Sequence, residues 1–386
     1  MERNDPRYQA YVEILKEELI PAMGCTEPIA LAYAAAKARE VLGVLPDSVQ
    51  LQVSGSIIKN VKSVIVPNTG HLKGMEAAVA AGIIAGSAEK ELEVISEVSE
   101  EKKSAIRDYL QTVPITIEHT EQGHVFDIVV TERCGQDYAR VRIADYHTNI
   151  CRIEKNGTVL YEVPLLDETV QENARADRSL LNMQDIWDFA ETADLRDVAD
   201  LLERQIRYNN AIAEEGLLGD YGANIGRVLL TTYGNDVSNR AKAKAAAGSD
   251  ARMNGCELPV IINSGSGNQG ITCSVPLIEY AKELHSGKEK LYRALIISNL
   301  VAIHEKTGIG TLSAYCGAVS AGAGAGAGIV YLCGDGYQAA IHTVVNALAI
   351  VSGIVCDGAK ASCAAKIASS VDAALLGYNM YKCNQE

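Results

Sequence analysis

The sequence lacks a basic surplus, because 49 acidic residues outnumber 35 Lys and Arg and give a formal net charge of −14. Nucleic acids and anionic membrane surfaces are polyanions, so this balance excludes a general affinity for either of them. Aromatic residues are also scarce, at 5%, whereas there are 33 glycines and long alanine runs. Since glycine permits close backbone approach, this composition predicts closely packed helices and a small molecule as the partner.

A strongly apolar segment that requires a membrane is also missing. The segment GAVSAGAGAGAGIVYLCG is mostly Gly and Ala, and GYQAAIHTVVNALAIVSGIV contains Gln, His and Asn. The N-terminal residues MERNDPRYQAYVEILKEEL are charged and amphipathic, without the basic start and apolar centre of a signal peptide. We therefore expect a cytoplasmic protein, in which disulfides rarely persist.

Hydrophobic patterns divide the chain into three expected parts. Residues 1–47 form a helical segment, interrupted at IPAMGCTEPIA, that packs with the C-terminal domain. Residues 48–166 alternate as in strands, beginning with VQLQVSGSIIKN, with helices expected at 74–85 and 99–111 and a hairpin turn at Asn156-Gly157. Residues 167–386 are mainly helical. The predicted fold class is α+β, with a small mixed α/β domain inserted before an all-α catalytic domain.

Ten cysteines are present, and three of them, Cys316, Cys356 and Cys363, lie in Gly- and Ala-rich surroundings near the C-terminus. Three thiolates can hold one [4Fe–4S] cluster and leave its fourth iron open as a Lewis acid. Neither the C-x₂-C run of ferredoxins nor a zinc-ribbon spacing is present, so the spacing equally permits cysteines that fill space in the core.

Another cysteine, Cys25, lies in the motif GCTEP at the expected helix break. Glu27 and Pro28 open the next helix, and free amides at a helix N-terminus stabilise a thiolate. A lowered pKa is therefore predicted, together with a role as nucleophile, ligand or general base. A cysteine chosen for its size beside a turn is the equal alternative.

The loop INSGSGNQGITCSVP, residues 262–276, alternates small residues with amides before an expected helix. Backbone N–H groups and hydroxyls of such a loop bind a carboxylate or a phosphate, whereas a plain surface turn seldom needs so many glycines. The candidate carboxylate contacts are Asn263, Ser264, Ser266, Asn268 and Gln269. Cys273, at the edge of the loop, is a candidate for the site or for packing.

Polar residues around two turns of the small domain, in SGSIIKN and VPNTGHLKG, form a further candidate set for substrate contacts: Ser54, Ser56 and Asn68. Solvated loop residues are the alternative interpretation, and the more usual one. His304, in HEKTG, poses the same choice, because a lone histidine is more often structural than an acid or a base.

Four motifs together, PAMGCTEP, NSGSGNQG, HEKTGIGTLSAYCG and SGIVCDGAKASCAAKIASS, resemble the L-cysteine desulfidase family. That family is related to the α chain of iron–sulfur-dependent L-serine dehydratases. The resemblance implies a [4Fe–4S] cluster with Cys316, Cys356 and Cys363 as ligands, in a helical domain that the α+β segment covers. It also implies that Cys25 is the catalytic base. His71, in PNTGHLKG, departs from the pattern, which has a small residue there.

The resemblance implies a lyase that needs no pyridoxal phosphate. Cys25 would remove the α-proton, and loss of sulfide from L-cysteine would give aminoacrylate, which hydrolyses to pyruvate and ammonia. L-Cysteine is the first expected substrate because the single chain lacks a separate β chain, and dehydration of L-serine is the alternative. An iron–sulfur sensor or carrier is the alternative from another class, although it needs neither a base nor a carboxylate site.

Two expectations concern association and the C-terminus. A homodimer is expected because glycine-packed helical surfaces often bury one another. Cys383, near the C-terminus, either frays in solvent, which we favour, or places its thiol on the open iron when substrate is absent.

Overall fold

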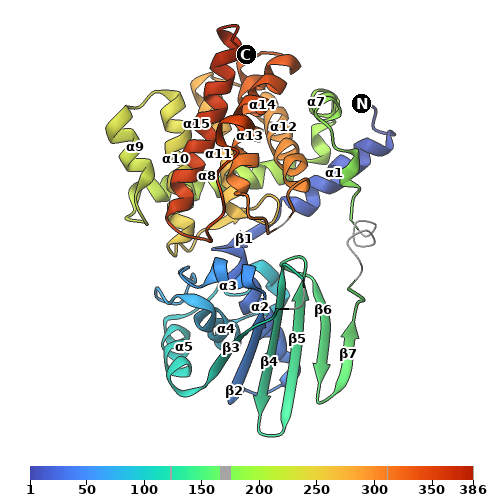
Figure 1. The fold of residues 1–386 in the computed structure, drawn as a ribbon, viewed down its shortest axis with the longest axis vertical. Coiled ribbons are helices and arrows are strands. Elements are labelled where there is room, and N and C mark those ends of the chain that lie inside the picture. The colour runs from blue at the N-terminus through green and yellow to red at the C-terminus, as the bar shows by residue number, and fades with distance from the viewer. Residues whose placement is uncertain (122–123, 166–174, 311, 386) are drawn as a thin grey trace.

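The computed structural model describes residues 1–121, 124–165, 175–310 and 312–385, which form two lobes (Figure 1). The sheet lobe contains a six-stranded sheet with helices against one face, and the helical lobe contains most of the remaining helices. The predicted fold class is therefore confirmed: N-terminal helices precede a mixed sheet, and a mostly helical region follows it.

The chain begins in the helical lobe with α1 (Pro6–Glu18) and enters the sheet lobe through strand β1 (Pro21–Met23). After the sheet, the chain returns to the helical lobe and completes it with the following elements: η3 (Arg178–Leu180), α7 (Met183–Thr192), η4 (Leu195–Asp197), α8 (Ala199–Leu218), α9 (Ile225–Tyr233), α10 (Val237–Met253), β8 (Pro259–Ile261), α11 (Gly267–Glu283), α12 (Lys288–Thr307), α13 (Gly317–Cys333), α14 (Tyr337–Val351) and α15 (Ser362–Lys382).

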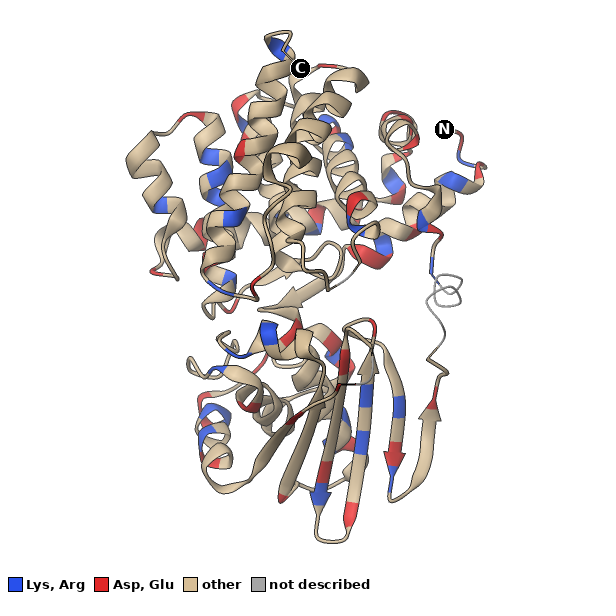
Figure 2. Ribbon diagram, viewed as in Figure 1, with Lys and Arg blue, Asp and Glu red and all other residues tan. Residues whose placement is uncertain are grey.

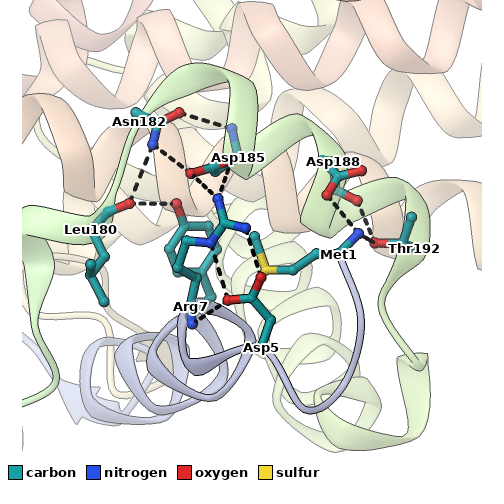
Figure 3. Close-up of polar contacts among 9 residues, drawn as sticks. Met1, Asp5, Arg7, Leu180, Asn182, Asp185, Asp188 and Thr192 are labelled. Carbon is teal, nitrogen blue, oxygen red and sulfur yellow. Dashed lines mark hydrogen bonds and ion pairs between the residues drawn. The ribbon is translucent and has the colours of Figure 1, made fainter.

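Helix α1 is attached to the start of α7 by polar contacts (Figure 3). The Arg7 guanidinium donates to the Asp185 carboxylate at 2.9 Å, and the Tyr11 hydroxyl donates to the Leu180 carbonyl at 2.8 Å. The Tyr11 ring is fully buried and packs edge-on against Phe189, with 5.4 Å between the ring centroids. Because a partly exposed ion pair contributes little, the buried aromatic contact is the stronger attachment.

The sheet has the strand order β3-β2-β4-β5-β6-β7, in which β2 and β3 are parallel and the other pairs are antiparallel. Its strands are β2 (Ser48–Val53), β3 (Ile115–His119), β4 (Asp127–Cys134), β5 (Asp137–Ala144), β6 (Ile150–Lys155) and β7 (Thr158–Glu162). The turn between β6 and β7 confirms the predicted hairpin, because Asn156 and Gly157 both have positive φ, 49° and 81°.

One face of the sheet packs against α2 (Thr26–Leu42), and α4 (Gly74–Ala85) lies beside α2. The two helices approach closely at Gly82, where a Cβ would lie 2.1 Å from the carbonyl oxygen of Ala32. The lobe also contains α3 (Gly55–Val61), η1 (Ala88–Glu93) and α5 (Glu100–Thr112). The helices predicted at 74–85 and 99–111 are confirmed as α4 and α5.

The opposite face of the sheet carries paired side chains of both signs, and Figure 2 shows the charged positions along β4, β5 and β6. Arg142 on β5 binds both carboxylate oxygens of Asp127 on β4, at 2.9 and 2.7 Å. On β6, Arg152 forms an ion pair with Glu162 of β7 at 2.9 Å. These cross-strand pairs neutralise one another, so this face agrees with the absence of a basic surplus.

Two expectations from the sequence differ from the structure. The segment SIIKN, expected to continue a strand, forms α3, in which Ile57, Asn60 and Val61 are buried at helical spacing. Within residues 1–47, α1 packs with the C-terminal helices, but α2 packs against the sheet. The boundary expected at 166/167 lies outside the described residues, so the three-part division stays a prediction.

Helix α13 contains the GAGAGAG segment and lies deep in the helical lobe. A Cβ on Gly324 would lie 2.4 Å from the carbonyl oxygen of Ser298 in α12, and one on Gly322 would lie 2.7 Å from the Ser370 Cβ in α15. The glycines thus allow α12 and α15 to pack closely against α13, as expected of a buried helix. Over the described residues, we find no helix with the length and apolar character needed to cross a bilayer.

A buried carboxylate on the inner face of β4 makes the stability of the protein dependent on pH. The side chain of Glu132 has 0% exposure, and neither of its oxygens has a hydrogen-bond partner among the described residues. Burial raises the pKa of Glu132 well above its usual value of 4.5, and the charge of Arg39 opposes this only in part. Because the unfolded chain releases this proton at lower pH, stability falls as pH rises above 4.5.

We expect Glu132→Gln to raise the free energy of unfolding at neutral pH by about 1 kcal/mol or more, because the amide needs no ionisation. The gain should disappear at about pH 4, where Glu132 keeps its proton in both states. Urea unfolding at several pH values measures this effect. Glu118→Gln, at an exposed position of β3, is the surface control. An equal gain of Glu132→Gln at every pH would contradict the explanation.

Candidate functional site

Pairing of β1 with β8 holds two of the sequence motifs together. Pro21 pairs with Ile261, and the Ile262 amide donates to the Ile20 carbonyl at 3.0 Å. The motif GCTEP follows β1, and the loop NSGSGNQG follows β8. The Thr26 hydroxyl donates to the carbonyl of Gly265 at 2.9 Å, which attaches the first turn of α2 to the glycine-rich loop.

Cys316 and Cys356 are placed side by side by a short backbone pairing. The Cys316 amide donates to the Ile354 carbonyl at 3.1 Å, and the Cys356 amide donates to the Ala314 carbonyl at 2.7 Å. Cys316 is the N-cap of α13, and Cys363 lies in the first turn of α15. Two helix starts and one loop therefore present the three cysteines.

The loop after Cys356 is held from both lobes. Within the helical lobe, a hydrogen bond from Lys366 lowers the pKa of Asp357 to about 2. From α3 of the sheet lobe, the Lys59 amine donates to the Cys356 carbonyl at 3.4 Å. Gly358 lies so close that a Cβ would be 2.3 Å from the Lys59 carbonyl oxygen. The sheet lobe thus contacts the cysteine loop.

These elements surround one cavity of about 110 Å³. The residues predicted from the sequence that line it are Cys25, Ser266, Asn268, Gln269, Cys316, Cys356 and Cys363. Helices α2, α11, α13 and α15 all begin at its wall. Because a helix N-terminus carries partial positive charge and free N–H groups, four such ends favour thiolates and anionic ligands in the cavity.

Cys25 lies at the N-cap of α2, as predicted, but its predicted lowered pKa is wrong. Burial raises the pKa of the Cys25 thiol well above its usual range, and the charge of Glu27 raises it further. The thiol is 3% exposed and donates to Glu27 Oε2 at 3.6 Å. Burial of the thiol and the neighbouring acid thus outweigh the effect of the helix N-terminus.

Glu27 is a second buried group of the cavity. Its carboxylate accepts a hydrogen bond from Asn60 Nδ2 at 2.9 Å, and its Oε2 lies 3.1 Å from the Thr26 hydroxyl oxygen, whose one proton is shared with the Gly265 carbonyl. Burial opposes its ionisation, but the nearby His147 and Arg252 and the hydrogen bond from Asn60 together outweigh burial and lower the pKa of Glu27. We did not predict Glu27 as a site residue, although GCTEP placed an acid two positions after the cysteine.

Two buried cations also line the cavity, and neither has an ion pair within the described ranges. Arg252 near the end of α10 is 2% exposed and donates to Asn268 Oδ1 at 3.1 Å. Lys306 on α12 is 6% exposed, and burial lowers its pKa against the opposing charge of Cys316. Neither residue was predicted from the sequence. Arg252 is the one arginine in the segment AKAAAGSDARM, and Lys306 lies two residues after the predicted candidate His304.

Six predicted substrate contacts are absent from the described cavity lining: Ser54, Ser56, Asn68, Asn263, Ser264 and His304. Asn263 is fully buried and donates to Asn299 Oδ1 at 3.0 Å, whereas Asn68 donates to the Ile95 carbonyl at 2.8 Å. The Ser54 hydroxyl donates to the Val125 carbonyl at 2.7 Å. The structure gives these polar groups partners within the protein instead of placing them at the cavity.

Cys273 and Cys383 also lie away from the cavity lining. Cys273 is fully buried in α11 against Ala302 and Ala321, and burial raises its pKa to about 12, which indicates packing. Cys383 follows the 21 residues of α15, which separate it from Cys363 by roughly 30 Å (Figure 1). The alternative in which Cys383 reaches the cluster of its own chain is therefore wrong.

The donor set fits an iron–sulfur cluster better than a single metal ion. Within the described residues, no group of three or more His, Cys, Asp or Glu side chains is arranged to hold one ion. Yet all ten cysteines are free, and four of them, Cys25 and the three predicted ligands, line the same cavity. A [4Fe–4S] cluster takes one thiolate per iron, so its ligands need not converge on one point.

Comparison with known proteins places the chain in a family. The family described as serine dehydratase alpha chain matches residues 89–386. A UPF0597 protein of Desulfitobacterium hafniense is 61% identical over 386 residues, which cover 100% of this chain and 89% of that protein. A UPF0597 protein of Lachnoclostridium phytofermentans is 54% identical over 369 residues, covering 96% and 88% of the two chains. One of Treponema denticola is 47% identical over 385 residues, covering 98% and 89%. The chain therefore belongs to the UPF0597 family and carries the serine dehydratase alpha chain domain.

Proposed function

We propose that this protein is an iron–sulfur-dependent lyase that eliminates sulfide from L-cysteine and gives pyruvate, ammonia and hydrogen sulfide without pyridoxal phosphate. The observation that carries the proposal is one cavity lined by Cys25 and by three further cysteines, Cys316, Cys356 and Cys363. Membership of the serine dehydratase alpha chain family supports elimination from a small amino acid.

Cys316, Cys356 and Cys363 would hold a [4Fe–4S] cluster, whose fourth iron supplies a Lewis acid for the leaving group. Burial raises the pKa values of the Cys316 and Cys363 thiols, and the positive charge of Lys366 lowers both in part. Burial lowers the pKa of Lys306, and the charges of Cys316 and Cys356 oppose this lowering.

Cys25 is the group that we propose as the base for the α-proton. It is buried, and it contacts an apolar set that includes Met253 and Cys363, so water is excluded around its sulfur. Arg252 lowers the pKa of Cys25, whereas burial and Glu27 raise it more strongly. The thiol therefore keeps its proton in the metal-free protein, and further positive charge in the cavity is needed to make it a base.

The leaving group distinguishes the two candidate substrates. Sulfide is a soft ligand that suits iron, which favours L-cysteine. The family description favours L-serine, so dehydration of L-serine is the second candidate. A cluster sensor or carrier is less well supported, because it needs neither a buried thiol beside an acid nor the two buried cations, Arg252 and Lys306, that form no ion pair with a described residue.

Anaerobically reconstituted protein should release sulfide and pyruvate in equal amounts from L-cysteine and should contain about four irons per chain. Sulfide, pyruvate and iron assays on one preparation measure this, with L-serine tested in parallel. Turnover of L-serine alone would establish the second candidate. A loaded cluster that is inert with both amino acids would contradict the lyase.

Substitution of the base should remove catalysis and keep the cluster. We expect Cys25→Ala to lower kcat by about 10²–10⁴-fold, the usual contribution of general base catalysis, with unchanged iron content. Cys333→Ala is the matched control, because Cys333 is exposed at the end of α13. Full activity of Cys25→Ala would exclude this thiol as the base.

Substitution of a ligand should have the opposite signature. Cys363→Ser should lose most of the iron and the visible absorbance of the reconstituted protein, because one iron loses its thiolate. Cys273→Ala is the control for loss of a buried cysteine outside the cavity, and we expect it to keep its iron content and its visible absorbance. Undiminished iron in Cys363→Ser would remove Cys363 from the ligand set.

A further inference from the structure

We infer that Arg252 binds the carboxylate of the substrate, an inference that rests on the proposed function and identifies the ligand group that this cavity recognises. The sequence assigned that task to the amides and hydroxyls of the NSGSGNQG loop. In the structure, two of those five residues, Asn263 and Ser264, do not line the cavity, whereas Arg252 does.

The guanidinium of Arg252 has no direct ion pair among the described residues, although its charge acts at longer range on the Glu27 carboxylate in the same cavity. Arg252 is among the largest fully buried side chains, yet no carboxylate of the described residues forms an ion pair with it. Its guanidinium contacts Asn268 Oδ1 at 3.1 Å and the Met253 sulfur at 3.5 Å, and its buried Nε has no partner in the described structure. A buried cation in this state is costly unless an anion joins it.

The glycine-rich loop explains how the guanidinium is positioned. A Cβ on Gly267 would lie 2.2 Å from Arg252 Nε, so a glycine is needed where the guanidinium crosses the start of α11. The next residue, Asn268, accepts the hydrogen bond from Arg252. Part of the loop therefore orients an arginine, whose planar fork of N–H donors matches a carboxylate.

The position of Arg252 relates it to the proposed base. Arg252 lines the cavity together with Cys25, and both side chains contact Met253. In an α-amino acid the carboxylate and the α-hydrogen are on the same carbon. A carboxylate bound at Arg252 thus brings that hydrogen to the region of the proposed base.

Binding of an amino acid that cannot react tests this inference. L-Alanine has the carboxylate but no leaving group, and L-alaninamide lacks the carboxylate charge. By anaerobic calorimetry on the reconstituted protein, we expect L-alanine to bind about 30-fold or more tightly than L-alaninamide. Arg252→Gln should abolish that preference, and Arg252→Lys should restore part of it.

A second measurement separates ligand binding from a structural role. Because Arg252→Gln removes a buried unpaired charge, the metal-free variant should unfold at the same or a higher urea concentration than the wild type. Arg240→Gln is the control on the same helix. Its side chain is paired with Glu283, so this variant should keep the preference for L-alanine.

The outcomes also distinguish this inference from the proposed function. Absent or equal binding of the two probes by the wild type would overturn the role of Arg252, as would a preference retained in Arg252→Gln. Marked destabilisation of metal-free Arg252→Gln with equal weakening of both probes would show a structural role instead. If the protein prefers L-alanine through Arg252 but turns over neither L-cysteine nor L-serine, the role of Arg252 in carboxylate binding would stand and the proposed lyase activity would be rejected.

Discussion

The pairing of β1 with β8 is the contact on which the cavity depends. It joins the strand before the GCTEP motif to the strand before the glycine-rich loop, although the two strands are more than two hundred residues apart. Each strand has three residues, so the pairing by itself is weak. It persists because Ala22, Val260 and Ile261 are buried between the lobes, and the hydrogen bond from Thr26 to Gly265 continues the connection.

The second constraint is the concentration of buried charge and sulfur at that junction. Glu27 has hydrogen-bond donors within the protein, whereas Arg252 and Lys306 have no carboxylate partner in the described residues. Such groups lower stability, and they persist where a ligand or a reaction uses them. The surrounding helices can tolerate the cost, because glycine and alanine contacts such as Gly324 on Ser298 let their backbones pack closely.

Much of the architecture could be predicted, because helices and strands leave periodic patterns in a single sequence. The helices at 74–85 and 99–111 and the turn at Asn156-Gly157 follow from local rules and are present. The path of α2 could not be predicted, since its alanine-rich surface suits either lobe. The segment SIIKN forms a helix instead of a strand. Burial of Ile57, Asn60 and Val61 at helical spacing outweighs its short alternating pattern.

The site shows the same division between local and distant information. The four cysteines were recognisable in their motifs, and the structure brings them to one cavity. Arg252 was not recognisable, because an arginine in an alanine-rich helix that also contains Arg240 is informative only when its burial and its lack of an acidic partner among the described residues are known. The glycine motif was interpreted as an anion-binding backbone. The close approach of Gly267 to Arg252 supplies a different reason for the glycine, since a side chain there would displace the cation.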